Sequence, residues 1–549
     1  MIFEDDELLV VNKPAGLNTH APSPYAGEGI YDWLRHREPR WASLAIIHRL
    51  DKDTSGLMVF AKTPLANRSL TEQFAGRTVR KTYLLVTDRA VPTRERLVQT
   101  VLVRAGEKYL ARPLHTGSVR AETRFRPLPA AEADQFTGRL NRRPAWVEAG
   151  TWHVLVAEPL TGRTHQIRVH AAHQGFPVLG DMLYGGTPAA RLYLHAAELQ
   201  LRHPATGGEL TFRVPADFVD PGHAPQPADS PLNLELRAAL FDPEETNVYR
   251  VSHGASDGWP GWYVERLGNY LFSQGTAPLS AAQQTALGRW CHRLSARGAV
   301  HVVLARETRE AQAALGEAAP ERFVVRENGL AFELSFNAGG SVGLFLDQRD
   351  NRRRLLARHV AAGFAPFPQG RVPEVLNTFA YTCGFSVCAA RAGARVTSLD
   401  LSRKHLDWGQ RNFQLNHLDP AGHDFIYGDV FAWLRRLANK QRRFDLILLD
   451  PPTFSQSKES GVFRAQKDYG RLVASALPLL QSGGVLFAST NAADWLPEAF
   501  LAAVRAPIAE AGLKCVQEHY APQPPDFPIS RQEPAHLKTV WLRLAKAGR

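Results

Sequence analysis

Two carboxylates stand in a short polar turn near the start of the chain. Asp51 and Asp53 lie within His48–Lys62, which reads HRLDKDTSGLMVFAK. The turn leads into an apolar run that favours a β-strand, and such a junction can hold one side chain at the edge of a strand. A carboxylate held there can act as a nucleophile or as a base. The simpler interpretation of Asp51 alone is a solvated turn between two strands.

Two further acids follow predicted strands in the last third of the chain. Arg395–Leu399 ends at Asp400, and Phe444–Leu449 ends at Asp450-Pro451-Pro452. Before Asp400, a strand, a glycine-containing loop and a helix alternate as in the first half of a doubly wound nucleotide-binding fold, in which such an acid suits ribose hydroxyls. This half-fold fits NAD or S-adenosylmethionine. The G-x-G-x-x-G pattern that pyrophosphate requires is absent, which disfavours NAD.

The elements that must position Asp51 are spread over the first 217 residues. Glu7–Asn12 predicts a strand, residues 81–86 another, and Thr151–Leu160 a third that leads into a turn and a helix. Residues 104–150 are rich in Arg, Gly and Pro. They predict a flexible arm with one strand near residues 121–125.

The totals indicate a multidomain globular protein. A chain of 549 residues is too long for one hydrophobic core, so about two to four domains are expected. The net charge of +11 favours a polyanionic partner such as nucleic acid, although a generally basic composition explains it equally well.

The cysteines and the N-terminus bear on the cellular compartment. Cys291, Cys383, Cys388 and Cys515 form no C-x-x-C pair, so neither a zinc site nor a disulfide framework is predicted. The first residues, MIFEDDELLVV, lack the basic start of a signal peptide, and no apolar run approaches the roughly 20 residues that span a bilayer. We expect a cytoplasmic protein without a metal or a membrane partner. Its oligomeric state is not indicated.

Six motifs of the first third occur in a familiar order. They are Asn12-Lys13-Pro14, HRLDKDTSG, Lys81-Thr82-Tyr83, TGRTHQIRVH, GDMLYGG and LHA. Together they resemble the RluA-type pseudouridine synthases. The resemblance implies an α+β catalytic domain with a mainly antiparallel or mixed sheet over residues 1–219. It also implies isomerisation of uridine to pseudouridine in RNA, without a cofactor.

The resemblance assigns roles to particular side chains of this domain. Asp51 becomes the carboxylate that acts beside the sugar. Arg163 matches the arginine that pairs with it and keeps it ionised. Tyr83 matches the aromatic that stacks on the target base, which must be flipped out of its stack. We expect His48 and Arg49 to shape the loop or contact phosphate.

Asp53 does not fall on the catalytic position of that family, and we expect it to be solvated. The following segment, Asp220–Leu232, is Pro-rich and polar and predicts an interdomain linker. A small α/β domain is predicted over residues 233–329, and a third domain over residues 330–549.

The third domain carries four further motifs. They are GLFLDQRDNR, LNTFAYTCGFSV, SLDLSRKHLDWGQRNFQLN and LLDPPTFSQSK. They resemble the class I S-adenosylmethionine-dependent methyltransferases of the large-subunit rRNA group that acts on cytosine C5 or guanine N7. This implies a Rossmann-like α/β domain with cofactor contacts at Phe379, Tyr381, Gly384, Asp400, Leu401, Asp429 and Asp450. Asp400 would hold the ribose and Asp429 would lie by the adenine. Asp450 would face the target base, and Phe454 could stack on it.

The missing cysteine helps to choose the methylated base. Cytosine C5 is a poor nucleophile, so enzymes that methylate it attack C6 with a thiolate. Gly483–Asn491, where this group carries that cysteine, contains none, and neither does Asp450-Pro-Pro-Thr. Guanine N7 is already nucleophilic and needs only positioning. We therefore favour guanine N7 and keep cytosine C5 as the alternative.

Two other functions remain open at this stage. The chain could be an rRNA-binding assembly factor with one active module, although Asp51, Arg163, Asp400 and Asp450 are all present. A small-molecule methyltransferase fits poorly with the basic charge. Arginines at 349 and 352–354, and a basic cluster over residues 435–443, could line an RNA path or serve solubility.

Overall fold

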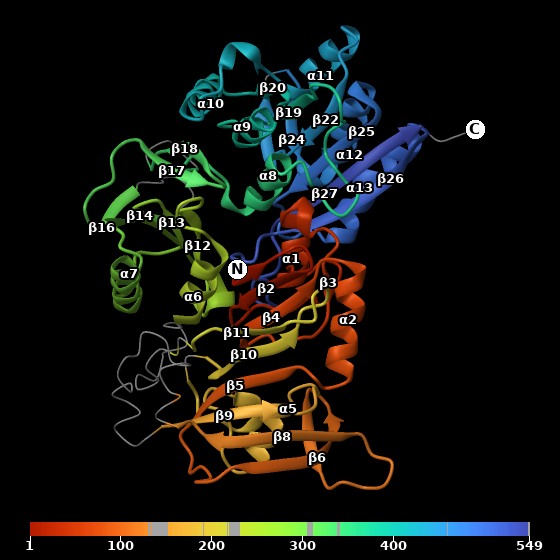
Figure 1. Cartoon of the computed structure of the whole chain (residues 1–549). Helices are drawn as coiled ribbons and strands as arrows, with labels where there is room; N and C mark the ends of the chain where they lie inside the picture. Colours follow the sequence, from red (N-terminus) through yellow and green to blue (C-terminus); the bar gives the residue numbers. More distant parts are fainter. Residues whose placement is uncertain are drawn as a thin grey trace. The chain divides into compact units, whose positions relative to one another are not determined.

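The computed structural model describes residues 1–129, 132, 152–189, 191–216, 218, 231–304, 311–336, 341–457 and 459–546. The chain forms two compact units (Figure 1). Unit 1 contains Met1–His20, Gly29–Tyr31 and Ser43–Ala239, and unit 2 contains Ala21–Glu28, Asp32–Ala42 and Leu240–Arg549. The predicted boundaries differ from this division, because residues 21–42 mostly join unit 2 and the middle segment does not form a unit of its own.

Unit 1 is built on one large sheet. Among the described residues its eleven strands are β1 Phe3–Glu4, β2 Leu8–Lys13, β3 Ala45–Ile46, β4 Ser55–Ala61, β5 Arg80–Thr87, β6 Arg96–Ala105, β7 Lys108–Arg112, β8 Arg120–Pro127, β9 His153–Pro159, β10 Leu194–Arg202 and β11 Glu209–Arg213. The main order is β1-β2-β4-β10-β5-β9-β8-β6-β7. All pairs are antiparallel except β4 with β10. This confirms the predicted α+β domain with a mixed sheet.

Two helices of unit 1 flank the predicted functional loops. Helix α2 spans Pro64–Ala75 and helix α5 spans Gln166–His173. Residues 104–129 are not the expected arm, because β7 and β8 pair with β6 as part of the sheet. Arg-rich composition misled the prediction, since outward-facing positions of an edge hairpin tolerate charge. The rest of that predicted arm lies largely outside the described residues.

A small α/β portion comes next along the chain. It contains α6 Pro231–Leu240, β12 Val248–His253, β13 Trp262–Leu267, β14 Tyr270–Gly275, α7 Ala281–Arg293, β15 Gly298–Val303, β16 Ala311–Gly316, β17 Phe323–Glu327 and β18 Leu330–Leu334. Strands β12 to β16 form one sheet, and β17 pairs with β18. Helix α6 belongs to unit 1 except for its last residue, whereas the other elements of this portion belong to unit 2.

The rest of unit 2 is a doubly wound sheet. Its elements are α8 Arg349–Leu356, β19 Glu374–Thr378, α9 Gly384–Arg391, β20 Arg395–Asp400, α10 Arg403–Leu415, β21 Asp424–Tyr427, α11 Val430–Asn439, β22 Phe444–Leu449, β23 Phe454–Ser457, β24 Gly461–Arg464, α12 Ala465–Ala476, β25 Leu480–Thr490, α13 Pro497–Glu510, β26 Leu513–Pro522 and β27 Lys538–Lys546. The order of the main sheet is β21-β20-β19-β22-β25-β27-β26, and within it only the pairs made by β27 are antiparallel. Strands β23 and β24 form a separate antiparallel pair.

Successive side chains of β22 point to opposite faces of this sheet, and helices cover both faces. Leu446 and Leu448 pack in one apolar cluster with α9 and α10. Ile447 and Leu449 pack in another with α11, α12 and α13. A strand buried on both faces has no polar side, which is the pattern of a parallel sheet. In such a fold, ligands bind at the carboxyl ends of the strands, where the strand order reverses. The structure thus confirms the predicted Rossmann-like domain.

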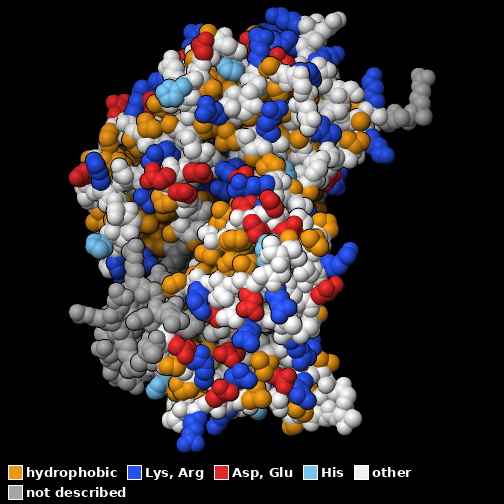
Figure 2. Space-filling view, viewed as in Figure 1, with side chains coloured by type: hydrophobic (Ala, Val, Ile, Leu, Met, Phe, Trp, Pro, Cys, Tyr) orange, Lys and Arg blue, Asp and Glu red, His pale blue; other side chains and the backbone are white. Residues whose placement is uncertain are grey.

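The arginines of α8 are not an RNA path. Arg349 and Arg352 are 1% and 2% exposed. Arg349 pairs with Asp526, and Arg352 donates to Glu327 over 2.6 and 2.7 Å. The sequence could not reveal this, because the partner carboxylates stand far away along the chain. Elsewhere the visible face mixes basic with acidic side chains (Figure 2).

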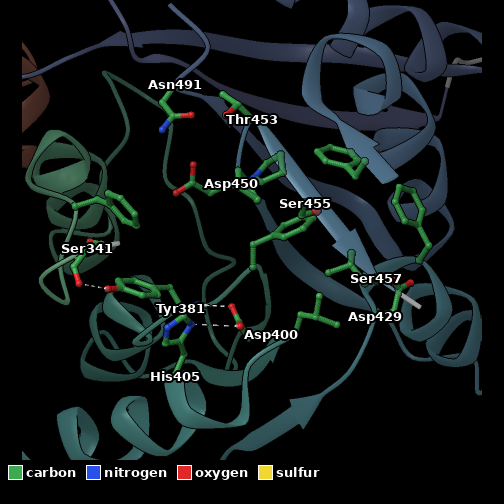
Figure 3. A pocket seen from close by; sticks show the side chains of 18 of the residues that line it. Ser341, Tyr381, Asp400, His405, Asp429, Asp450, Thr453, Ser455, Ser457 and Asn491 are labelled. Carbon is green, nitrogen blue, oxygen red and sulfur yellow. Dashed lines mark hydrogen bonds and ion pairs between the residues drawn. The ribbon is translucent and has the colours of Figure 1, made fainter. Parts of the chain in front are cut away.

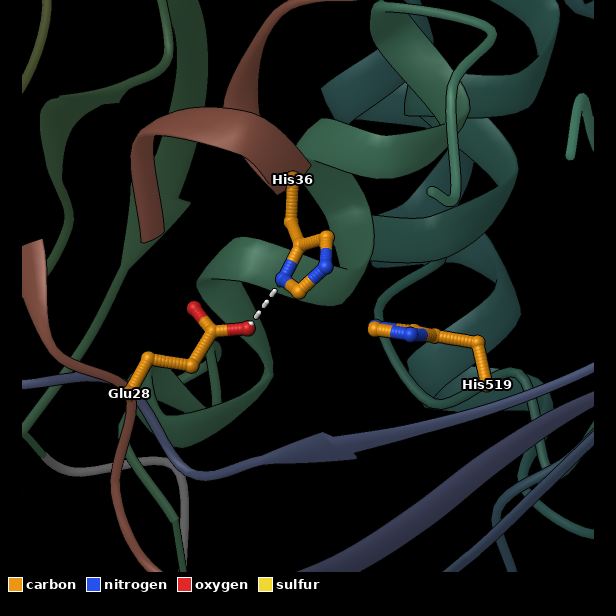
Figure 4. A group of neighbouring side chains, drawn as sticks. All are labelled: Glu28, His36 and His519. Carbon is orange, nitrogen blue, oxygen red and sulfur yellow. Dashed lines mark hydrogen bonds and ion pairs between the residues drawn. The ribbon is translucent and has the colours of Figure 1, made fainter. Parts of the chain in front are cut away.

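Segment 21–42 is held in unit 2 by the same helix. Arg354 Nη2 lies 3.4 Å from Glu28 Oε1 and 3.5 Å from His519 Nε2. Glu28, His36 and His519 offer ligand-type atoms within 4.8 Å of one another (Figure 4). The guanidinium already supplies positive charge there and would repel a metal ion. We therefore interpret this cluster as an internal ion pair.

Breaking the buried pair of α8 is expected to destabilise unit 2. Arg349→Met would leave Asp526 buried without this guanidinium, and removal of one partner of a buried pair costs about 3–5 kcal/mol. Urea unfolding followed by tryptophan fluorescence should show a transition at lower urea. The control is Arg435→Met on the exposed face of α11. Coincident transitions of the two variants would contradict this account.

In the described part of the chain we find no helix with the length and apolar character that crossing a bilayer requires.

Candidate active sites

A buried lysine holds the turn that carries Asp51 in place. Lys13 is 0% exposed, and its Nζ donates to the carbonyls of Pro14, Leu17 and Lys52 at 2.8–3.0 Å. Burial lowers the pKa of Lys13 to about 7, against the opposing pull of Asp53 and Asp51. A buried ammonium that satisfies three carbonyls ties the end of β2 to the turn before β4.

Arg168, rather than Arg163, lies beside Asp51. Arg168 Nη1 is 3.5 Å from Asp51 Oδ2. Its Nε and Nη2 each donate to Asp181 over 2.7 Å, a bidentate pair that fixes the plane of the guanidinium. The side chain of Arg163 is exposed. The assignment of Arg163 to this pair is therefore corrected.

Local folding explains that correction. TGRTHQIRVH contains two arginines, and α5 begins only at Gln166. Gln166 accepts hydrogen bonds from the Arg163 amide and the Thr161 hydroxyl, which closes a turn before the helix. Arg163 lies on this outer turn, whereas Arg168 lies on the buried face of the helix. Only the start of the helix decides which of the two points inward.

Tyr83, the predicted stacking aromatic, lies within the sheet of unit 1. It is 9% exposed on β5, between β10 and β9. Burial raises the pKa of Tyr83 well above its usual value, and the charge of Asp51 adds to this. Tyr83 is therefore a neutral phenol at physiological pH.

His48 shapes the turn instead of facing phosphate. Its Nε2 accepts a hydrogen bond from the Val59 amide at 3.1 Å, and its ring stacks on Phe74 with centroids 4.8 Å apart. Burial lowers the pKa of His48 to about 3, so the ring is neutral. Arg49 and Asp53 are exposed, and for Asp53 this is what the sequence predicted.

A second site lies at the carboxyl ends of the parallel strands in unit 2. It is a cavity of about 480 Å³, the size of a small-molecule pocket (Figure 3). Six of the seven predicted cofactor residues line it: Phe379, Tyr381, Asp400, Leu401, Asp429 and Asp450. The seventh, Gly384, opens α9 and is not among the described residues that line the cavity.

The loop after β19 has an unusual backbone. Phe379, Tyr381 and Cys383 have φ angles of 56°, 49° and 64°, which non-glycine residues rarely adopt. Asp400 holds this loop, because its Oδ2 accepts from the Tyr381 amide and its Oδ1 from the Ser402 amide, both at 2.8 Å. Strain of this kind persists where surrounding contacts enforce it, commonly around ligands.

Asp429 and Asp450 differ in their surroundings. Burial would raise the pKa of Asp429, but hydrogen bonds from Ser457, Ser460 and the α11 backbone lower it. Burial raises the pKa of Asp450 to about 6, and the charge of Asp347 adds to this effect. Gln348 Nε2 donates to Asp450 Oδ1 at 3.1 Å.

Phe454 and the cysteines are not among the described residues that line the cavity. Phe454 is 54% exposed on β23, with the Arg464 guanidinium 5.6 Å from its ring centroid, and is not a lining residue. No cysteine is among the described residues that line the cavity. Cys383 and Cys388 are buried, and burial raises the pKa of the Cys383 thiol to about 12.

The sequence analysis missed several site residues for one common reason. His165, Arg168 and Asp181 all lie in the quoted motifs, but their roles depend on side-chain direction. The sequence did hold one local clue to the pair of Arg168 and Asp181. GDMLYGG places Asp181 in a turn, where an acid has few roles other than pairing. Gln348 and Asp347 likewise lie within GLFLDQRDNR, whose contacts only the fold reveals.

Comparisons with known proteins match the two parts of the chain that hold these sites to two families. Residues 7–173 match the family model described as RNA pseudouridylate synthase, and residues 280–543 match the one described as S-adenosylmethionine-dependent methyltransferase. A Streptococcus mutans structure described as a SAM-dependent methyltransferase has a TM-score of 0.50 and 23% identity, and covers 63% of this chain and 87% of its own. At that identity the likeness concerns the fold.

Among curated proteins, a ribosomal RNA large subunit methyltransferase of Deinococcus radiodurans is 35% identical over 330 residues, which are 57% of this chain and 77% of that one. Ribosomal RNA large subunit methyltransferase K of Neisseria meningitidis serogroup B is 40% identical over 32% of this chain and 46% of its own. Ribosomal RNA large subunit methyltransferase I of Klebsiella pneumoniae is 34% identical over 260 residues, which are 46% of this chain and 62% of that one. The chain thus spans less than two thirds of these last two relatives. It belongs to the S-adenosylmethionine-dependent methyltransferases, uses S-adenosylmethionine as its methyl donor, and joins to this module an RNA pseudouridylate synthase.

Proposed function

We propose that the chain modifies large-subunit rRNA twice, converting one uridine to pseudouridine and methylating one guanine at N7. The proposal extends to this chain what the names of its relatives say of them. The observation that carries it is the pair of separate sites, one around Asp51 and one around Asp450. The residues described for each site lie within one unit.

In the first site, Asp51 acts on the sugar of the flipped uridine. The cation of Arg168 favours the ionised carboxylate that this step needs. Tyr83 stacks on the base as a neutral phenol. Arg49 is exposed near the turn and can contact RNA phosphate, whereas His48 supports the turn from within.

In the second site, the cofactor occupies the 480 Å³ cavity. The chain fits an adenosyl group there, because Asp400 stands at the end of β20 for ribose hydroxyls and Asp429 stands at the start of α11 by the adenine. Phe379, Tyr381 and Leu401 supply apolar and backbone contacts. The bound cofactor supplies an electrophilic methyl group, and the chain positions the base beside it.

Asp450 can bind either candidate base, because guanine and cytosine both present N–H donors and a carboxylate offers only acceptors. The choice of guanine therefore rests on the cysteines. The absence of a cysteine among the described lining residues weighs against cytosine C5, which needs a thiolate at C6. The raised pKa of the buried Cys383 also opposes thiolate formation. Phe454 is exposed and can stack on RNA.

The test compares the rRNA of a strain that lacks the gene with that of its parent. We expect mass spectrometry of 23S rRNA digests to show that one pseudouridine and one 7-methylguanosine are lost, and that the cloned gene restores both. Loss of a 5-methylcytidine in place of 7-methylguanosine would overturn the choice of base. If every mark persists, the proposed function is wrong.

A further inference from the structure

His165 stands next to Asp51 in a strained conformation. It precedes α5 with φ 56° and ψ 15°, in the left-handed region that only a few per cent of residues other than glycine adopt, with asparagine, aspartate and histidine enriched among them. Its side chain is 19% exposed, and its Nε2 lies 3.9 Å from Asp51 Oδ2. An enforced outlier beside a reactive group is a reason to look for a function.

Two features favour one tautomer of the His165 ring, the first of them a chain of hydrogen bonds. The Tyr109 amide donates to the Tyr184 hydroxyl oxygen at 2.9 Å. That hydroxyl lies 2.8 Å from His165 Nδ1 and can give its own hydrogen to it. Nδ1 is then an acceptor, so that Nε2 of the neutral ring is an N–H. A lone pair on Nε2 would face the Asp51 carboxylate, which favours the same tautomer.

The neighbours of the ring keep it neutral. Burial lowers the pKa of His165, and repulsion from Arg168 adds to this against the opposing charges of Asp51, Asp181 and Asp53. The rings of Tyr109 and Tyr184 meet it edge-on, with centroids at 5.9 and 5.6 Å. Arg168 is itself held by Asp181. The imidazole is therefore oriented by its surroundings and presents one N–H toward the carboxylate.

The separation of 3.9 Å is too long for a hydrogen bond but suits one bridging oxygen. Two hydrogen bonds of about 2.8 Å that meet at roughly 90° span this distance. A hydroxyl between the two groups can accept from Nε2 and donate to Asp51. The step assigned to Asp51 takes place at the ribose, so the nearest hydroxyl of the substrate is the one on C2′.

We propose that His165 is a substrate-positioning residue whose Nε2–H binds the 2′-hydroxyl of the target uridine. The contact places the reacting ribose carbon beside Asp51 and distinguishes RNA from DNA at this point. The inference rests on the proposed pseudouridine synthase activity. Tyr184 acts through His165 by fixing its tautomer.

Three variants separate this role from a structural one. His165→Asn keeps a residue that tolerates the left-handed backbone, and its amide reaches only the Nδ1 position. His165→Gln places an amide near the Nε2 position. Tyr184→Phe keeps the ring under the Arg168 guanidinium, which lies 5.2 Å from its centroid, but removes the hydroxyl.

The first measurement is pseudouridine formation in a short transcript that spans the mapped uridine. We expect His165→Asn to lower kcat/KM by about 10- to 100-fold, the range that one lost hydrogen bond to a charged or reacting group gives. His165→Gln should recover most of this loss, and Tyr184→Phe should fall between them. Wild-type kcat/KM in His165→Asn would overturn the proposal. If the wild type makes no pseudouridine, the proposed function fails instead.

The second measurement identifies the atom contacted. In an Asp51→Asn background, which prevents turnover, the affinity is compared for the same RNA with uridine or 2′-deoxyuridine at the target. We expect His165→Asn to weaken binding of the first RNA about 10-fold and to leave the second unchanged, because a pair in contact is coupled. Equal losses for both RNAs would show that His165 does not contact the 2′-hydroxyl.

Discussion

Replacing Asp51 by asparagine is expected to abolish pseudouridine formation and leave methylation unchanged. An amide of the same shape keeps the turn but lacks the charge that the reaction needs, and loss of such a group typically costs about 10⁴-fold or more in rate. Pseudouridine is measured by mass spectrometry of a transcript, and methylation by transfer of a labelled methyl group from S-adenosylmethionine.

The matched control for this change is Asp53→Asn. The two acids stand two residues apart in one turn, yet only Asp51 lies beside Arg168 and His165, whereas Asp53 is exposed. Near wild-type activity of Asp53→Asn would show that the charge must be at Asp51. Normal pseudouridine formation by Asp51→Asn would refute the assigned role, and a parallel loss of methylation would refute the independence of the two sites.

Replacing Asp450 by alanine is expected to reduce methylation by about 10²- to 10³-fold and leave pseudouridine formation intact. Preorganised polar groups aimed at the reacting partner contribute rate factors of about this size. The control is Asp407→Ala, an exposed acid on α10. Comparable methylation by the Asp450 and Asp407 variants would exclude Asp450 from the proposed contact with the base.

The same group gives methylation a dependence on pH. Burial and the neighbouring charge of Asp347 raise the pKa of Asp450 to about 6. The carboxylate form is the one that accepts from guanine, so the rate should fall as the pH drops through about 6. Asp347→Asn removes the neighbouring charge and should move the midpoint to lower pH. A rate that stays constant between about pH 7 and pH 5 would contradict the need for an ionised Asp450.

The two units differ in how readily the sequence reveals their folds. The alternation of apolar strands with helices, together with the acids that end two of the strands, predicted the doubly wound sheet, because a parallel strand buried on both faces must be apolar throughout. The strands of residues 96–127 were harder to predict, because an edge hairpin can carry many exposed arginines. The membership of residues 21–42 in unit 2 had no signal in the sequence, since it rests on ion pairs such as Arg354 with Glu28.

By itself, the sequence determined the chemistry that this protein carries. Asp51, Tyr83, Asp400, Asp429 and Asp450 all stand in the motifs that predicted their roles, and in the structure the last three line one cavity. The positions of such residues can be predicted from the sequence, because each directly follows a strand or stands in a turn. Its place along the chain then determines its place in the fold.

Only the tertiary structure decided which neighbours complete the sites. It selected Arg168 over Arg163 because α5 begins at Gln166, and it made the arginines of α8 internal pairs in place of an RNA surface. It also turned His165 toward Asp51, which no local pattern indicates. The physical reason is common to all three. The direction of a side chain depends on where its helix starts and on what packs opposite, and contacts between residues distant in the chain set both.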